Sequence, residues 1–237
     1  MEPTLFSEDN RAFFENYVEQ TQCVLLRMLK IFDTICSKYD IDYWLDYGTL
    51  LGAVRHRGFI PWDVEADVGM LRSDFEVFLQ KGPQNLPMDI FWQTGETDHD
   101  YLPSSYFIEA KLRDKYSNYS QWADNNRHCK WHNGIQIDIF VYDLDNVLDN
   151  CLTNAYERIL SDRRIYLKRE ELEYLERQPF ADYSFPIPAG SDAYLKRNYD
   201  DYWQLPPMDK RVSEVVEVFS ACNHREILHW NAKAPER

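Results

Sequence analysis

The sequence predicts an α+β fold in which helices flank a mixed β-sheet, with a helical carboxyl-terminal region. Strand-like and helix-like segments intermix through the first 145 residues, and helical spacing dominates after them. The chain of 237 residues is 44% hydrophobic and 15% aromatic, which is sufficient for a packed core. We therefore expect a single domain over residues 1–237, with its core at about 14–145 and a helical part at about 146–237.

The amino-terminal elements are a long helix, a short strand and a second helix. Across residues 14–39, apolar side chains recur at the three- and four-residue spacing that gives a helix one buried stripe. A short aromatic strand is expected at 42–47, followed by a tight turn at Gly48-Thr49 and a helix over 50–54. The turn therefore lies at the amino terminus of a helix.

The next elements are a strand and a helix. Residues 64–70 alternate apolar with acidic side chains, as a strand with two different faces does. Ser73-Asp74-Phe75-Glu76 has the pattern of a capping box, which predicts that a helix starts there and continues to about Gln80.

The remaining chain is expected to contain three more strands and two more helices. Strands are predicted at 88–93, 106–112 and 134–142, with a polar loop around 118–126 before the last of them. Residues 151–177 have helical spacing with many charges, and a helix is expected near 191–203 between proline-rich breaks.

Composition excludes several classes of function. There are 40 acidic residues against 26 basic ones, a formal charge of −14, which argues against nucleic-acid binding. The most apolar segment, 24–35, is interrupted by Arg27, Lys30 and Asp33, so no membrane span is expected. The amino terminus lacks a signal-peptide pattern, which favours a cytoplasmic protein, with a trimmed domain of the Golgi lumen as the alternative.

A pair of carboxylates is the first sign of chemistry. Glu65 and Asp67 lie two apart on a predicted strand, so they project from one face with Cα atoms about 6.5–7 Å apart. Such a pair can close on a divalent cation, or it can be the solvated face of an edge strand.

A third carboxylate favours the cation. Asp138 lies within a strand whose neighbours, Ile137 and Ile139, indicate burial, and a buried carboxylate needs a compensating positive partner. Three acidic ligands on neighbouring strands would form an all-oxygen site suited to Mg²⁺ or Mn²⁺. Asp63 and Asp143 are further candidates, with turn or cap roles as the alternative.

Phosphate-binding groups lie near these carboxylates in sequence. Gly48-Thr49 offers backbone N–H groups and a hydroxyl at a helix amino terminus. Arg55, with its neighbours in the basic stretch 55–57, and the pair Lys111 and Arg113 would form a cationic rim, unless they are ordinary salt-bridge partners.

Several blocks of the chain resemble the LicD family, which includes bacterial phosphocholine transferases and fukutin-related proteins. The resemblance covers residues 40–211. Its blocks are 43–70 (YWLDYGTLLGAVRHRGFIPWDVEADVGM), 110–114 (AKLRD), 134–143 (GIQIDIFVYD), 188–195 (PAGSDAYL) and 201–207 (DYWQLPP).

The resemblance implies a nucleotidyltransferase-like fold and a metal-dependent transfer reaction. It implies that Glu65, Asp67 and Asp138 hold Mg²⁺ or Mn²⁺ and are catalytic. The donor would be a CDP-activated alcohol, such as CDP-choline or CDP-ribitol, the acceptor a hydroxyl of a glycan, and the product CMP. The residues expected to contact the donor are Gly48, Thr49, Arg55, Lys111, Arg113 and Asp114.

One departure from the family pattern leaves alternatives open. Relatives usually carry consecutive aspartates where this chain has Asp63-Val64-Glu65, so a catalytically silent relative that binds a nucleotide or a glycan is one alternative. A true nucleotidyltransferase, which would release pyrophosphate, is another.

The sequence supports a zinc site among its histidines and cysteines less well than it supports the all-oxygen site. His128, Cys129 and His132 lack a fourth ligand at a suitable spacing, so a zinc site is not expected there.

Overall fold

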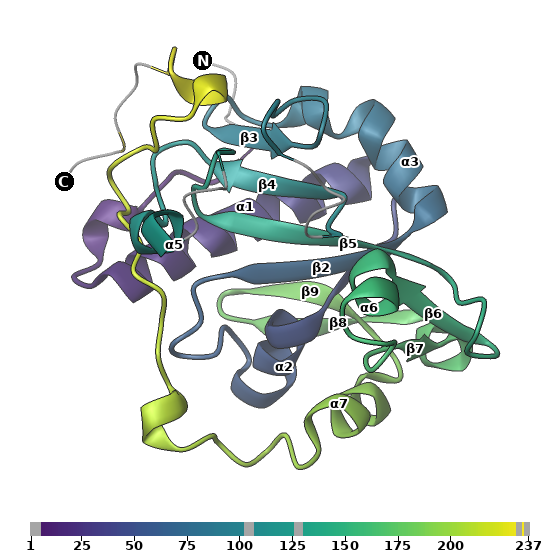
Figure 1. Cartoon of the computed structure of the whole chain (residues 1–237). Helices are drawn as coiled ribbons and strands as arrows, with labels where there is room; N and C mark the ends of the chain where they lie inside the picture. The colour runs from purple at the N-terminus through teal and green to yellow at the C-terminus, as the bar shows by residue number, and fades with distance from the viewer. Residues whose placement is uncertain (1–5, 102–106, 126–129, 231–233, 235–237) are drawn as a thin grey trace.

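A mixed β-sheet with helices packed around it forms the body of the molecule, which confirms the predicted α+β class (Figure 1). The computed structural model describes residues 6–101, 107–125, 130–230 and 234. In this part the helices are α1 (Tyr17–Lys38), α2 (Tyr47–His56), α3 (Arg72–Lys81), α5 (Ser120–Asn125), α6 (Ala155–Ile159) and α7 (Ser191–Tyr199). The strands are β1 (Trp44–Leu45), β2 (Ala66–Leu71), β3 (Ile90–Gln93), β4 (Ala110–Asp114), β5 (Gln136–Leu144), β6 (Cys151–Asn154), β7 (Leu167–Lys168), β8 (Leu175–Phe180) and β9 (Tyr183–Pro188).

The central sheet is built around β5. Its main path runs β1-β2-β5-β4-β3, and β6 pairs with β5 and carries β7, which makes seven strands. Only the pairing of β2 with β5 is parallel among these described strands. The hairpin β8–β9 forms a separate two-stranded sheet, and β9 packs against β1.

Helix α1 covers the back of the sheet in the view of Figure 1. It begins where the Asn16 side chain accepts a hydrogen bond from the N–H of Glu19 at 3.0 Å, a typical amino-terminal cap. Its apolar stripe, which includes Leu25, Met28 and Phe32, is fully buried in the core, so the predicted amphipathic helix over 14–39 is confirmed.

Helix α2 is longer than predicted and starts earlier. Its amino-terminal cap is Asp46, whose carboxylate accepts the N–H of Tyr47 at 2.9 Å, so Gly48 and Thr49 lie in its first turn. It ends at Arg57, which has the left-handed φ of 54° that closes many helices.

The capping box expected at Ser73 is wrong. Helix α3 follows β2 with no loop between them, so its cap position is Leu71, which has no side-chain acceptor. The carboxylate of Asp74 instead accepts the N–H of Asp42 at 3.0 Å. The predicted strands at 64–70, 88–93 and 134–142 are present with shifted ends, as β2, β3 and β5.

The helix expected over residues 151–177 is also wrong. This segment contains β6, the short helix α6, β7 and the first part of β8, so strands make up much of the carboxyl-terminal part that was expected to be helical. The burial pattern of β8 shows why. Its side chains are mostly exposed or half-buried, because the hairpin covers the domain with one face only, and no strict apolar alternation marks the strand. The helix expected near 191–203 is present as α7.

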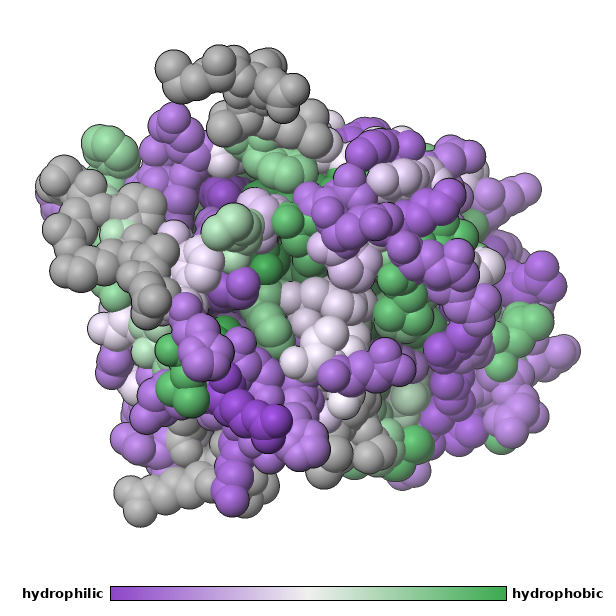
Figure 2. All heavy atoms as spheres, turned by 90° about the horizontal axis from the view of Figure 1, so that it is seen from above, coloured by the Kyte–Doolittle hydropathy of each residue, from purple (hydrophilic) through white to green (hydrophobic). Residues whose placement is uncertain are grey.

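The surface matches the acidic, polar composition. Figure 2 shows a face dominated by hydrophilic residues, with hydrophobic ones in separate groups between them. No helix in the described residues is long and apolar enough to cross a membrane. His128, Cys129 and the start of the strand predicted at 106–112 lie outside the described residues.

Candidate active site

Polar side chains form two rows across one face of the sheet. Strand register places Asp67 beside Asp138, and Asp138 beside Lys111. Residues two positions away share the same face of a strand, so the row formed by Gln136 and Arg113 lies next to the first one. The residues between them in β2, β4 and β5, which include Val68, Leu112 and Ile137, are apolar and buried in the core.

The first row contains a buried ion pair. The Lys111 ammonium lies 2.7 Å from Oδ1 of Asp138, and both side chains are about nine-tenths buried. Asp67 lies on the neighbouring strand β2, and no described residue donates a hydrogen bond to its carboxylate. One cation therefore compensates two carboxylates in this row.

The second row links to the first through an amide. Gln136 donates from Nε2 to Oε1 of Glu65 at 2.7 Å and accepts from the Lys111 ammonium at 3.1 Å. Arg113 donates from Nε to Gln93 at 2.8 Å and from Nη1 to the carbonyl of Gly134 at 2.8 Å. These bonds fix the orientation of both cations and of Glu65.

Burial and mutual repulsion shift the protonation of the acidic groups. Burial, with the negative charge of Asp138, raises the pKa of Glu65 to about 7. The same two causes raise the pKa of Asp67 well above its usual range. Burial also lowers the pKa of the Lys111 ammonium, although the charge of Asp138 opposes this. The face thus holds more negative charge than its cations neutralise.

The amino terminus of α2 lies against this face. The Thr49 hydroxyl accepts the N–H of Asp67 at 2.8 Å, which ties the helix to β2. A Cβ atom on Gly48 would lie 3.1 Å from Oδ2 of Asp63 and 3.9 Å from Oδ2 of Asp67. Glycine therefore lets the first turn of α2 approach two carboxylates closely.

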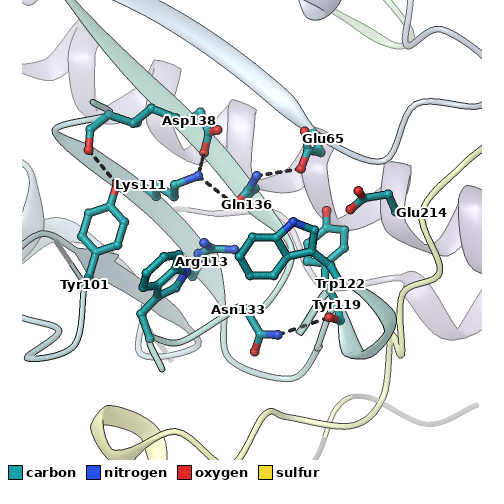
Figure 3. Close-up of a pocket in the computed structure, with 12 residues that line it drawn as sticks. Glu65, Tyr101, Lys111, Arg113, Tyr119, Trp122, Asn133, Gln136, Asp138 and Glu214 are labelled. Atoms are coloured by element: carbon teal, nitrogen blue, oxygen red, sulfur yellow. Dashed lines mark hydrogen bonds and ion pairs between the residues drawn. The ribbon is translucent and has the colours of Figure 1, made fainter. Parts of the chain in front are cut away.

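A pocket opens over the second row (Figure 3). It encloses about 210 Å³. Lys111, Arg113 and Asp138 form its floor, while Glu65 and Glu214 lie along one side. Its remaining walls are mainly aromatic and come from Tyr101, Tyr119, Trp122 and Trp131.

Sequence reasoning did not identify several pocket residues. Gln136 was detectable, because it precedes Asp138 by two residues and must share its face of the strand. Glu214 comes from the carboxyl-terminal tail, and nothing in the local sequence marks it as a pocket residue.

Three predicted residues lie away from this face of the sheet, whereas Asp67, Gly48 and Thr49 lie on or against it but do not line the pocket. Arg55 is at the end of α2 and donates from Nη1 to the carbonyl of Tyr202 at 2.7 Å. Asp114 is buried on the other face of β4, where it accepts two hydrogen bonds from Arg11 at 2.9 and 2.6 Å. Asp143, the second extra carboxylate, pairs with Arg72 at 2.7 Å. The structure therefore gives these three residues structural contacts.

The donor set on the sheet face suits a hard divalent cation. Glu65, Asp67 and Asp138 supply only oxygen atoms, and with Asp63 near Gly48 the carboxylates outnumber Lys111 and Arg113. Burial, with the negative charge of Asp138, raises the pKa values of Glu65 and Asp67. A bound cation would supply positive charge to these groups.

The chain is similar to several known proteins. Residues 40–190 match the family model for the LicD/FKTN/FKRP nucleotidyltransferase domain. The chain is 45% identical to lipopolysaccharide cholinephosphotransferase LicD of Haemophilus influenzae over 85% of this chain and 97% of that protein. It is 41% identical to an uncharacterized protein of Rickettsia typhi over 40% of this chain and 38% of that one. A short segment, 14% of this chain, is 50% identical to 7% of the human ribitol 5-phosphate transferase FKRP.

Proposed function

The chain belongs to the LicD family, and from this membership we propose that it transfers a phosphorylated alcohol from a CDP-activated donor to a hydroxyl of a glycan. The observation that carries the proposal is the sheet face on which Asp67 and Asp138 lie beside Lys111, next to a pocket. Negative groups for a cation and positive groups for phosphate are the two requirements of phosphoryl-transfer chemistry.

A Mg²⁺ or Mn²⁺ ion would be held by Glu65, Asp67 and Asp138. It would supply positive charge to the phosphates of the donor and to the leaving CMP. Glutamate at position 65 reaches about one bond further than aspartate, and the hydrogen bond from Gln136 holds its carboxylate toward Asp138.

Lys111 and Arg113 would bind the donor phosphates. Both are buried at the pocket floor, and Arg113 uses only two of its five N–H donors on described residues. The ammonium of Lys111 is held by Asp138 in the absence of donor, and a phosphate oxygen would compete for it.

The pocket favours phosphocholine as the transferred group. A volume of about 210 Å³ lies below the roughly 300–1,000 Å³ of pockets for drug-sized ligands, so it suits one small part of the donor. Trp122, Trp131 and Tyr101 present aromatic walls, and Glu214 adds a carboxylate. Aromatic surfaces with a nearby negative charge are typical of quaternary ammonium recognition, whereas ribitol would need several hydroxyl partners.

Asp67 is the proposed acceptor of the proton from the glycan hydroxyl. Its carboxylate receives no hydrogen bond from a described residue, whereas Oδ1 of Asp138 is paired with Lys111.

The test is product analysis with purified protein. CDP-choline and CDP-ribitol are each incubated with a glycan acceptor in Mg²⁺, in Mn²⁺ and in EDTA, and CMP is measured. We expect metal-dependent CMP release, faster with CDP-choline, that disappears in Asp138→Asn and persists in Asp149→Asn, an exposed control on a distant turn. Release of pyrophosphate from CTP instead would identify a nucleotidyltransferase, and no turnover of any donor would leave a silent binding protein.

A further inference from the structure

A second group of metal-ligand side chains lies outside the carboxylate face. It consists of His132, which precedes β5, and of Cys222 and His224 in the carboxyl-terminal tail. One ligand atom from each residue lies within 4.8 Å of those of the other two. We propose that these three side chains bind a Zn²⁺ ion that fixes the carboxyl-terminal tail to the wall of the pocket.

The convergence of the three side chains supports the site. Nδ1 of His132 lies 2.7 Å from Sγ of Cys222, although the two residues are 90 positions apart in sequence. Nδ1 of His224 is buried and makes no hydrogen bond to a described residue. His132 is completely buried and Cys222 is 6% exposed. A buried nitrogen without a partner is costly, and a metal ion would satisfy it.

The donor atoms select the metal. Two imidazoles and a thiolate suit zinc, whereas Mg²⁺ and Ca²⁺ prefer oxygen. Zinc bonds of about 2.3 Å to sulfur and 2.0–2.1 Å to nitrogen set the two atoms about 3.5 Å apart, so His132 and Cys222 would separate by less than ~1 Å. Binding would release the thiol proton to solvent. No fourth His, Cys, Asp or Glu joins the group within the described residues, which leaves the fourth position to water.

The site would join two regions that form the pocket. His132 lies between Trp131 and Asn133, which both line the pocket. The tail runs along the side of the domain near α5 (Figure 1). There it forms a bridge between Glu217 and Asn118, and it contributes Glu214 to the pocket. A metal ion at Cys222 would therefore hold the tail beyond this bridge and stabilise one wall of the pocket.

The test uses metal content and spectroscopy of the full chain. After expression in zinc-supplemented medium, we expect about one zinc per chain by mass spectrometry of the metal, as for a single site. Replacement of zinc by Co²⁺ should give the absorption bands of tetrahedral cobalt and a thiolate-to-cobalt charge-transfer band. The oxygen-only carboxylate face cannot give that band, so this readout isolates the His132–Cys222–His224 site even in the unmodified protein.

Variants identify the ligands. Zinc and the charge-transfer band should be lost in Cys222→Ser and strongly reduced in His224→Gln. They should persist in Cys23→Ser, which changes a half-buried thiol of α1, and in His99→Gln, which changes another histidine. A second readout needs no variant: bound zinc should protect Cys222 from alkylation, and a chelator should remove the protection. Wild-type protein without zinc after supplementation, or Cys222→Ser with unchanged zinc and an unchanged charge-transfer band, would overturn the proposal.

Discussion

Two groups of buried carboxylates in this molecule have opposite environments. Asp46 accepts hydrogen bonds from Tyr142 at 2.7 Å and Tyr194 at 2.9 Å, besides the N–H that caps α2. Asp114 receives two bonds from the Arg11 guanidinium. The protein itself therefore supplies several hydrogen-bond donors to each of these two carboxylates.

The carboxylates of the sheet face lack such donors. Asp67 receives none from a described side chain, and Glu65 receives one, from Gln136. Repulsion from Asp138 adds to burial in raising the pKa of both groups. This comparison shows that burial of a carboxylate alone does not identify it as part of a metal-binding site. Buried carboxylates with complete donor sets hold the fold together, and those left short of positive charge are free to hold a ligand.

The largest expected effect is on catalysis. Asp138→Asn should lower the rate of phosphoalcohol transfer roughly a thousandfold, because several kcal/mol of charge stabilisation depend on the cation that Asp138 helps to hold. The free energy of unfolding should fall only modestly, because relief of the repulsion on Glu65 and Asp67 offsets the loss of the buried Lys111–Asp138 ion pair. Steady-state kinetics and urea unfolding of the same preparation check both statements. Full activity in this variant would remove Asp138 from the site.

Asp114→Asn should instead lower the stability of the fold and leave the activity nearly unchanged. It leaves the buried Arg11 guanidinium with only one of its two carboxylate partners, Asp9, which is expected to cost about 3 kcal/mol of stability, at the lower end for breaking a buried ion pair. The activity per folded molecule should stay close to that of the wild type. Urea unfolding with kinetics corrected for the folded fraction measures this.

The double variant Arg11→Met/Asp114→Leu is the matched control, since it removes both charges of this pair and should recover part of the lost stability, although Asp9 then loses its Arg11 partner. If Asp114→Asn instead folds normally and loses activity, Asp114 belongs with the donor-binding residues and our comparison fails.

Gly48→Ala should have an intermediate effect, confined to metal and donor binding. The new methyl group would lie 3.1 Å from a carboxylate oxygen of Asp63, so this side chain must shift. We expect metal affinity to fall about tenfold, at the lower end of the effect of changing groups around metal ligands. Gly58→Ala is the control, because its nearest new contact is at 3.9 Å. Equal metal affinity in the two variants would show that the first turn of α2 does not shape the site.

The smallest effect is on the pH dependence of stability. The pKa of Glu65 is raised from 4.5 to about 7 in the folded protein, so the folded state binds more protons than the unfolded state between these values. The metal-free protein should therefore lose stability as the pH rises from about 4.5 to 7. Metal affinity should increase over the same range, because binding requires the carboxylate.

In Glu65→Gln, the decline in stability between these pH values should become shallower. Thermal unfolding of the metal-free proteins at several pH values measures it, and identical slopes in both proteins would show that Glu65 is not the group that titrates.

The sequence predicted which side chains share this face of the sheet better than it predicted the surrounding elements. Alternation around β2 and within β4 was enough to place Glu65 with Asp67, and Lys111 with Arg113, on common faces, since a strand has a strict period of two. The parallel register that brings Asp67 beside Asp138 depends on long-range pairing, which local sequence does not encode.

Two errors have clear physical causes. The hairpin β8–β9 turns at Ala181, with a φ of 52°, and Asp182, so it lacks the glycine or asparagine that usually marks such a turn. Asp114 was expected at the donor, together with Lys111 and Arg113, because the 110–114 block resembles the LicD family. Asp114 lies an odd number of positions from both, so the pleat sends it to the opposite face, where Arg11 binds it.

The most direct test of the central claim is calorimetric titration of Mn²⁺ into three proteins: the wild type, Asp138→Asn and Asp114→Asn. We predict that the wild type and Asp114→Asn bind Mn²⁺ with similar affinity and that Asp138→Asn binds it at least about tenfold more weakly. Equal affinity in Asp138→Asn, or selective loss in Asp114→Asn, would contradict the assignment of the sheet-face carboxylates as the metal site.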